Sequence, residues 1–250
     1  GAGRLASVEV ILDSVKLALR STSAPDTVYV EPAFGSSGLT LAASDGVTVA
    51  EAQAEAPLAD LAGIRVLVTA GGTREPIDPV RFVGNRSSGR EGHAIAEAAA
   101  ERGALVTLIT TTSLPVPAGI TRISVNTADE MLSAALEAAE PAELVVMTAA
   151  VADFRPAAVA TDKLKKADGI PQIVLDPTVD ILSKLGERKP AGQILVGFAA
   201  ETSQVAKNAT EKLTRKNCDL IVANDVSAPG VGFEHETNAV TIFTATGGSV

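Results

Sequence analysis

The chain has 250 residues, of which 46% are hydrophobic and 20% charged, and its formal net charge at pH 7 is −9. This length suffices for one α/β domain with a buried sheet and a smaller appendage, and the negative charge argues against nucleic acid or an anionic membrane as a partner. The single cysteine excludes an internal disulfide, and the lack of a signal peptide or membrane-spanning apolar run predicts a cytoplasmic protein.

The first 62 residues differ in texture from the rest of the chain. Residues 1–23 carry apolar side chains at helical spacing, among them Ile11, Leu12 and Val15. Residues 24–62 are rich in Ala, Ser, Gly and Asp and contain no Lys or Arg, which is typical of a linker or a small insert.

From Ile64 onward, predicted strands alternate with predicted helices. The apolar run at residues 64–69 predicts a strand buried on both faces. The other predicted strands are 105–110, one near Ile123, 143–149, 172–175, 193–198, 219–223 and 239–244, and the predicted helices are 90–102, 128–139, 179–187 and 204–216. This alternation predicts an α/β fold with a mostly parallel sheet and helices on both faces. Ligands of such sheets bind beyond the carboxyl ends of the strands, so the loops there are candidates for chemistry.

Two glycine-rich stretches, residues 70–76 and 84–92, follow the first predicted strand. Glycines let the backbone approach a phosphate, and the start of the next helix offers free N–H groups. The Gly-x-Gly-x-x-Gly pattern is absent. The second stretch has the outer spacing of a P-loop, but Arg90 and Glu91 replace its Lys and its Ser or Thr. The alternative is that Ser87 or its neighbouring serine caps the helix and the glycines serve turns.

Charged residues near the other strand ends each have a functional and a purely structural interpretation. Asp153 follows a predicted strand and could accept a ribose hydroxyl, contact a metal or cap a turn. The basic run Lys163–Lys166 is either a solvated face or a cluster for a polyphosphate. Lys212 and Lys216 lie on one helix face, where they could bind phosphate or simply complement the helix dipole.

Two further residues end buried strands. Phe198 is either a core side chain or an aromatic wall for a nucleotide base, and Asn224 could either read a base edge or cap a turn.

Taken together and in this order, these motifs resemble phosphopantothenate–cysteine ligase, also called phosphopantothenoylcysteine synthetase. The matching stretches are residues 68–82, 85–89, 149–155, 163–166, 197–202 and 223–225. The resemblance implies a Rossmann-like nucleotide-binding fold that works as a homodimer. It also implies that CTP, with Mg²⁺, converts the carboxylate of 4'-phosphopantothenate into an acyl-cytidylate, releasing pyrophosphate, and that the amine of L-cysteine then displaces CMP.

The resemblance implies catalytic roles for three residues. Asn85 matches the residue that binds phosphopantothenate and holds the acyl intermediate, Lys163 matches the lysine needed to form it, and Arg81 matches a substrate-binding arginine that reaches in from the partner subunit. The nucleotide-binding positions that it implies are Gly71, Ser87, Gly89, Gly92, Met147, Thr148, Ala149, Ala150, Asp153, Lys163, Thr178, Val179, Asp180, Ile181, Phe198, Lys212, Lys216 and Asn224. It gives no metal ligands.

The chain departs from the family pattern at one motif. The family usually has Asn-Pro-Asp-Ile where this chain has residues 178–181, Thr-Val-Asp-Ile, so the backbone geometry that the proline contributes is absent. The family also usually continues into a final helix, which is missing after Val250.

The resemblance divides the chain into three parts. Residues 1–23 resemble the tail of a flavin-dependent decarboxylase domain, to which FMN would belong, residues 24–62 are the insert, and residues 63–250 form the ligase domain. Two alternatives remain open at this point: a nucleotide-binding module without catalysis, and an NAD(P)-dependent dehydrogenase, although the latter's glycine fingerprint and acidic ribose anchor are absent.

Overall fold

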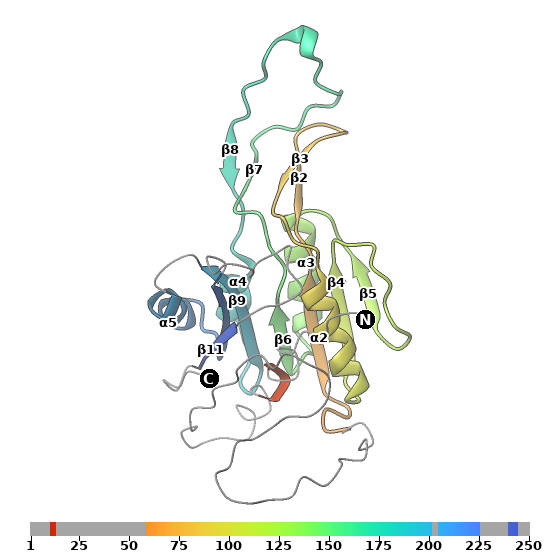
Figure 1. Cartoon of the computed structure of the whole chain (residues 1–250), viewed down its shortest axis with the longest axis vertical. Helices are drawn as coiled ribbons and strands as arrows, with labels where there is room; N and C mark the ends of the chain where they lie inside the picture. The colour runs from red at the N-terminus through yellow and green to blue at the C-terminus, as the bar shows by residue number, and fades with distance from the viewer. Residues whose placement is uncertain (1–10, 14–58, 202–204, 226–239, 245–250) are drawn as a thin grey trace, which may run out of the picture.

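The computed structural model describes residues 11–13, 59–201, 205–225 and 240–244 (Figure 1). A seven-stranded sheet with the order β11-β10-β9-β6-β1-β4-β5 forms its centre, and every neighbouring pair is parallel except β10 with β11. Its strands are β1 (Arg65–Ala70), β4 (Leu105–Thr110), β5 (Thr121–Ser124), β6 (Leu144–Met147), β9 (Ile194–Glu201), β10 (Leu220–Asp225) and β11 (Val240–Thr244). The helices are α2 (Arg90–Glu101), α3 (Ala128–Ala139), α4 (Ile181–Arg188) and α5 (Val205–Arg215). The predicted α/β fold with a mostly parallel sheet is confirmed.

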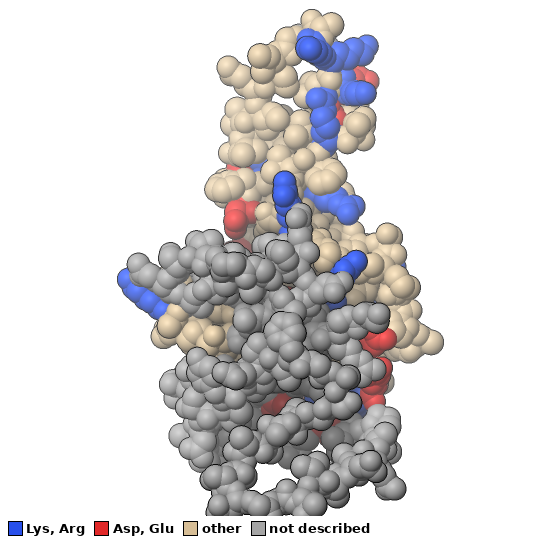
Figure 2. Space-filling view, viewed as in Figure 1, with Lys and Arg blue, Asp and Glu red and all other residues tan. Residues whose placement is uncertain are grey.

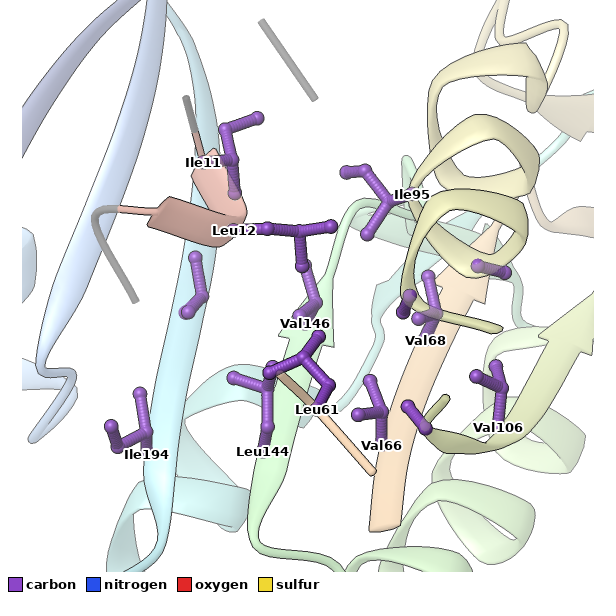
Figure 3. Close-up of a cluster of buried hydrophobic side chains, with 14 of the residues drawn as sticks. Ile11, Leu12, Leu61, Val66, Val68, Ile95, Val106, Leu144, Val146 and Ile194 are labelled. Carbon is purple, nitrogen blue, oxygen red and sulfur yellow. The ribbon is translucent and has the colours of Figure 1, made fainter. Parts of the chain in front are cut away.

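Helices cover both faces of this sheet, as predicted. The central strands β1 and β6 are consequently buried on both sides. On one face α2 packs with a helical turn at residues 11–13, whose Ile11 and Leu12 are fully buried among the strand residues. Figure 3 shows Leu12 close to Val146 of β6, with Ile95 of α2 nearby. On the other face α3, α4 and α5 bury a second apolar cluster. No helix among the described residues is long and apolar enough to span a membrane.

The remaining residues of the N-terminal segments, 1–10 and 14–58, lie outside the described part of the chain, as do Gln204 and Ala239, with which the predicted helix 204–216 and strand 239–244 begin. The expected tail helix and insert can therefore be placed only at residues 11–13 and 59–62. Leu61 is buried in the same cluster as Leu12, so this core includes residues that precede Ile64.

The sheet changes direction between β1 and β6. From β1 the chain moves outward through β4 to β5, and it then returns to the other side of β1 and moves outward through β6, β9 and β10. The chain thus leaves the neighbouring strands β1 and β6 toward opposite edges of the sheet. The loops that directly follow these two strands meet at a bridge between Gly72 and Ala150. Such a switch point is where open α/β sheets bind their ligands.

Helix starts near this edge follow from local sequence. Thr127 and Glu130 form a capping box at α3, in which the Thr127 hydroxyl accepts a hydrogen bond from Glu130 N at 3.2 Å. At α4 the Asp180 carboxylate accepts one from Ser183 N at 3.0 Å.

Two hairpins, which we call the arm, project beyond the sheet, and the second includes residues 157–174 with the 3-10 turn η1 (Lys166–Asp168) (Figure 1). The first pairs β2 (Arg74–Pro76) with β3 (Phe82–Gly84), and the second pairs β7 (Phe154–Pro156) with β8 (Leu175–Pro177). The prediction of a strand at 172–175 among the βαβ units is wrong, because only Leu175 is in a strand and that strand belongs to the arm. Its apolar run, which suggested burial in the sheet, is exposed instead, with Val174 67% accessible.

Candidate functional site

A cavity of about 480 Å³ opens at the carboxyl ends of β6 and β9, next to the switch point. Its lining includes these predicted nucleotide or substrate residues: Asn85, Met147, Ala149, Ala150, Asp153, Thr178, Val179, Asp180, Ile181, Phe198, Lys212 and Lys216. The structure thus brings together side chains that are widely separated in the sequence. One wall is apolar, and two lysines from the end of α5 face the same space.

The cavity also has lining residues that the sequence reasoning missed: Arg86, Val151, Ala152, Leu182 and Ala199. Each of them is next to a predicted residue or lies within a predicted loop, so adjacency in the sequence was the available signal. Arg86 adds a third cation beside Asn85, which favours an anionic ligand.

The loop after β6 forms the floor of the cavity, and three side chains hold its backbone. Thr73 Oγ1 accepts a hydrogen bond from Ala152 N at 2.9 Å, and Thr178 Oγ1 donates to Ala152 O at 2.5 Å. Asn85 Nδ2 donates to Val151 O at 3.0 Å. The floor is therefore tied to the glycine loop on one side and to the start of α4 on the other. Thr178, which stands where the family pattern usually has Asn, makes this link with its own hydroxyl.

The two lysines are placed differently. Lys212 lies in the last turn of α5, whereas Lys216, one residue beyond that helix, forms an ion pair with Asp180 at 2.8 Å. Burial alone would raise the pKa of Asp180, but Lys216 and the N–H of Ser183 outweigh it and lower the pKa. Asp180 is therefore ionised near neutral pH, caps α4 and holds the Lys216 ammonium at the cavity wall.

The predicted phosphate loop lies at the start of α2, beside the switch point. Gly71 and Gly89 have positive φ angles of 92° and 73° and pack against each other, because a Cβ at Gly89 would lie 3.2 Å from Gly71 Cα. A Cβ at Gly92 would lie 2.7 Å from Ala70 Cβ, so glycine lets α2 approach β1 closely. Gly89 itself is the N-cap and makes no side-chain cap, while Ser88 Oγ accepts a long hydrogen bond from Arg90 N at 3.4 Å.

This glycine-rich turn is adjacent to the cavity. The described lining residues of the cavity do not include Gly71, Ser87, Gly89 or Gly92. Thr148 also points elsewhere, because its hydroxyl donates to the carbonyl of Thr69 on β1. Gly71, Gly89 and Gly92 are buried, so the part of this turn that could meet phosphate oxygens is the half-buried Ser87 and the exposed Ser88 at the start of α2.

Glu91 occupies the first turn of α2, where a P-loop has a hydroxyl. Burial raises the pKa of its carboxyl to about 7, and its Oε1 is buried without a hydrogen-bond partner. At and below neutral pH a large share of this carboxyl is protonated. The first turn of α2 therefore carries less negative charge than an ionised carboxylate would bring, and it would repel a phosphate beside Gly71 and Gly89 less strongly.

Two predicted residues lie away from the cavity. Arg81 and Lys163 belong to the arm, and neither is among the described lining residues. Asn224 lies on β10, where its backbone pairs with Ala200, but its side chain is outside the described part of the structure.

Among the described residues, no group of three or more His, Cys, Asp or Glu side chains could hold a metal ion. The cavity contributes the carboxylates of Asp153, which is exposed, and Asp180, which is paired with Lys216. This set does not form a protein cage. It fits a Mg²⁺ ion that is bound mainly by phosphate oxygens and water.

Comparison with known proteins identifies relatives of this fold and site. Residues 61–250 match the model of the DNA/pantothenate metabolism flavoprotein C-terminal domain family. The coenzyme A biosynthesis bifunctional protein CoaBC of Bacillus subtilis (strain 168) is 52% identical over 192 residues, which cover 76% of this chain and 47% of that protein. The chain thus spans about half the length of this relative.

Solved structures agree. The C-terminal domain of a coenzyme A biosynthesis bifunctional protein CoaBC superposes with a TM-score of 0.64 at 44% identity, covering 76% of this chain and 86% of that one. A Cab2 mutant, H337A, in complex with phosphopantothenate-cysteine shares the fold with a TM-score of 0.62 at 20% identity, covering 75% of this chain and 79% of that one. The chain therefore belongs to the family of DNA/pantothenate metabolism flavoprotein C-terminal domains.

Proposed function

We propose that this chain joins L-cysteine to 4'-phosphopantothenate, with CTP as the activating nucleotide, as a step of coenzyme A biosynthesis. The observation that carries the proposal is the cavity at the switch point, which gathers Asn85, Phe198 and Lys212 from separate elements. The relatives support the same reaction class, since CoaBC is a coenzyme A biosynthesis protein and the Cab2 structure holds phosphopantothenate-cysteine.

The chemistry requires an activated carboxylate. A carboxylate is a poor electrophile until one of its oxygens becomes part of a good leaving group. Attack of a carboxylate oxygen on the α-phosphorus of CTP achieves this, because it forms an acyl-cytidylate and releases pyrophosphate. Pyrophosphate departs with negative charge building on it, and Lys212 would stabilise that charge from the end of α5. The amine of cysteine then attacks the acyl carbon, which the Asn85 amide would orient from the rim of the cavity.

Mg²⁺ would enter with the nucleotide, and it would supply further stabilisation of the phosphate charge. Asp153 is the exposed carboxylate at the cavity and would complete the coordination of the ion. A pyrophosphate-release assay with CTP, 4'-phosphopantothenate and cysteine tests the proposal. Release that requires both CTP and phosphopantothenate supports it, whereas NAD(P)-linked turnover, or nucleotide binding without release, would replace it with one of the two alternatives.

We also propose that the chain works as a homodimer. The arm exposes several large apolar side chains on hairpins whose strands have only three residues each: Val80, Phe82, Phe154, Val159, Ile170, Ile173, Val174 and Leu175. Concentrated exposed apolar surface of this kind is typical of an interface. Light scattering of the purified chain measures its mass directly.

Phe198 gives a test of how the base is held. It is half-buried within β9, which runs three residues further than the predicted strand end, and it lines the cavity. If a base stacks on its ring, Phe198→Leu should weaken CTP binding by roughly tenfold, since base–aromatic stacking contributes about 1–3 kcal/mol, while kcat at saturating CTP changes little. Leucine keeps the apolar bulk, so the stability of the fold should be nearly unchanged. Calorimetric titration with CTP measures the affinity, and an unchanged affinity would place the base elsewhere.

A further inference from the structure

A fully buried carboxylate sits in the turn of the arm's first hairpin. Asp78 Oδ1 accepts hydrogen bonds from the N–H groups of Val80 and Arg81, each at 2.8 Å. Its Oδ2 accepts two from the Arg81 guanidinium, at 3.0 and 2.5 Å, and one from Leu164 N at 3.1 Å. Burial by itself would raise the pKa of Asp78, but these donors outweigh it and hold the pKa well below its usual range. The carboxylate is therefore charged at every pH at which the protein is assayed.

The same contacts fix the basic segment of the arm. Leu164 is held at both ends of its peptide unit, because its N–H donates to Asp78 and its carbonyl accepts from Arg81 Nη2 at 2.6 Å. Ala160 N also donates to Ile77 O at 2.9 Å. Lys163 immediately precedes Leu164, so its backbone is fixed beside Arg81 although the two residues are 82 positions apart in the sequence.

Asp78 also balances charge at this junction. Its carboxylate pairs with the Arg81 guanidinium at 2.5 Å, which lowers the net positive charge at the point where the backbone of the exposed Lys163 passes Arg81.

Neither cation is among the described lining residues of its own chain's cavity, and the arm projects away from the sheet (Figure 1). Figure 2 shows lysine and arginine side chains gathered on the projecting part.

We infer that Asp78 is a positioning residue that fastens Arg81 and the backbone beside Lys163 into one basic unit. The family resemblance implies that Arg81 acts in the cavity of the partner subunit, so this unit would reach the anionic ligand of a second copy of the chain. The inference rests on the proposed function for its ligand, and it adds the residue that joins the two cations. It also specifies that both cations come from the same chain.

Asp78→Asn separates the two halves of the contact. Its amide oxygen can still accept from Val80 and Arg81 N–H, which keeps the hairpin turn. Its NH₂ group would face the donors of Arg81 and Leu164, which breaks the link to the basic segment. We expect acyl-cytidylate formation to slow by about a hundredfold, as is typical for misplaced catalytic groups, while the affinity for CTP changes less than about twofold. Asp176→Asn, an exposed change on β8 of the arm, is the control and should leave both quantities unchanged.

A triple variant distinguishes positioning from general damage to the fold. If Asp78 acts through Arg81 and Lys163, then adding Asp78→Asn to the double variant Arg81→Ala, Lys163→Gln should slow the reaction no further. Fully multiplied losses would overturn the inference.

Mixed dimers test which chain supplies the unit. Differently tagged variants are co-purified so that only heterodimers are assayed. Arg81→Ala paired with Lys163→Gln should show no recovery of activity, because each cavity then receives one defective unit. Either variant paired with Lys212→Gln should recover up to about half of the activity, since one cavity is then complete. Recovery in the first pairing, or its absence in the second, contradicts delivery as one unit to the second copy.

A measurement without activity keeps this inference separate from the proposed function. Hydrogen exchange at residues 160–166 should be at least about tenfold faster in Asp78→Asn than in the wild type, and unchanged in Asp176→Asn. Unchanged exchange in Asp78→Asn would sink the proposed role of Asp78 whatever reaction the protein catalyses. Wild-type protein that releases no pyrophosphate would count against the proposed function instead.

Discussion

Replacing Lys163 by glutamine is expected to slow formation of the acyl-cytidylate by about a hundred- to a thousandfold. Pyrophosphate leaves with negative charge building on it, and the loss of one charged contact to a transition state typically costs about 2.7–4 kcal/mol. Glutamine keeps most of the length and polarity of the side chain but cannot carry the charge. Lys163 is exposed on the arm, so the substitution should not disturb the fold.

Asn85→Asp provides the contrasting variant. Asn85 is a neutral amide tied to the cavity floor through Val151 O, and it can hydrogen-bond an acyl group without a charge of its own. A carboxylate there should still allow the intermediate to form but slow its capture by cysteine. Mass spectrometry of quenched single-turnover reactions should find the intermediate accumulating in Asn85→Asp and absent in Lys163→Gln. Accumulation in both variants, or in neither, would show that the two residues do not divide the half-reactions in this way.

Glu91→Gln is expected to stabilise the fold by up to about 3 kcal/mol at pH 8 and by almost nothing at pH 4. The pKa of Glu91 rises with burial from 4.5 to about 7, and each pKa unit corresponds to about 1.4 kcal/mol. Below about pH 4.5 the carboxyl is protonated in both the folded and unfolded states. Between about pH 4.5 and 7 the unfolded chain has already lost this proton while the folded chain keeps it, so the stability of the wild type falls over this range and levels off above it, whereas that of the glutamine variant does not change for this reason.

Urea unfolding at the two pH values measures this difference. Glu137→Gln on α3 is the matched control, because Glu137 is exposed on a helix surface. Its effect should stay within about 0.5 kcal/mol at both pH values. A Glu91→Gln variant with the same stability increment at pH 4 and pH 8 would mean that the buried carboxyl is not the titrating group.

The sequence predicts the elements of the central sheet well where periodicity is strong. The helix at 128–139 and the strand at 105–110 have the predicted bounds, and β1 is displaced by one residue. These elements are long, and their buried faces repeat regularly. The arm could not be predicted in this way, because its strands have three residues each and expose apolar side chains.

The candidate site, too, could be predicted from the sequence only in part. The motifs placed Asp153 and Phe198 at strand ends. In the fold Asp153 directly precedes β7 and Phe198 lies within β9, and both line one cavity. Contacts between distant segments left no local pattern. The link from Asp78 to Leu164 spans 86 residues, and the pairing of Lys216 with Asp180 spans 36. Only a structure could show that these carboxylates organise the cations that the motifs identified.

The buried turn at residues 11–13 has a consequence for the order in which the protein can fold. Ile11 and Leu12 pack into a cluster that includes Val146, Ile194 and Ile242, so their partners are synthesised long after them. Contacts between positions so far apart in the chain raise the contact order and slow folding. This turn must therefore wait, with its apolar side chains unpacked, until the second half of the sheet leaves the ribosome, and that interval is when a chaperone would be of most use.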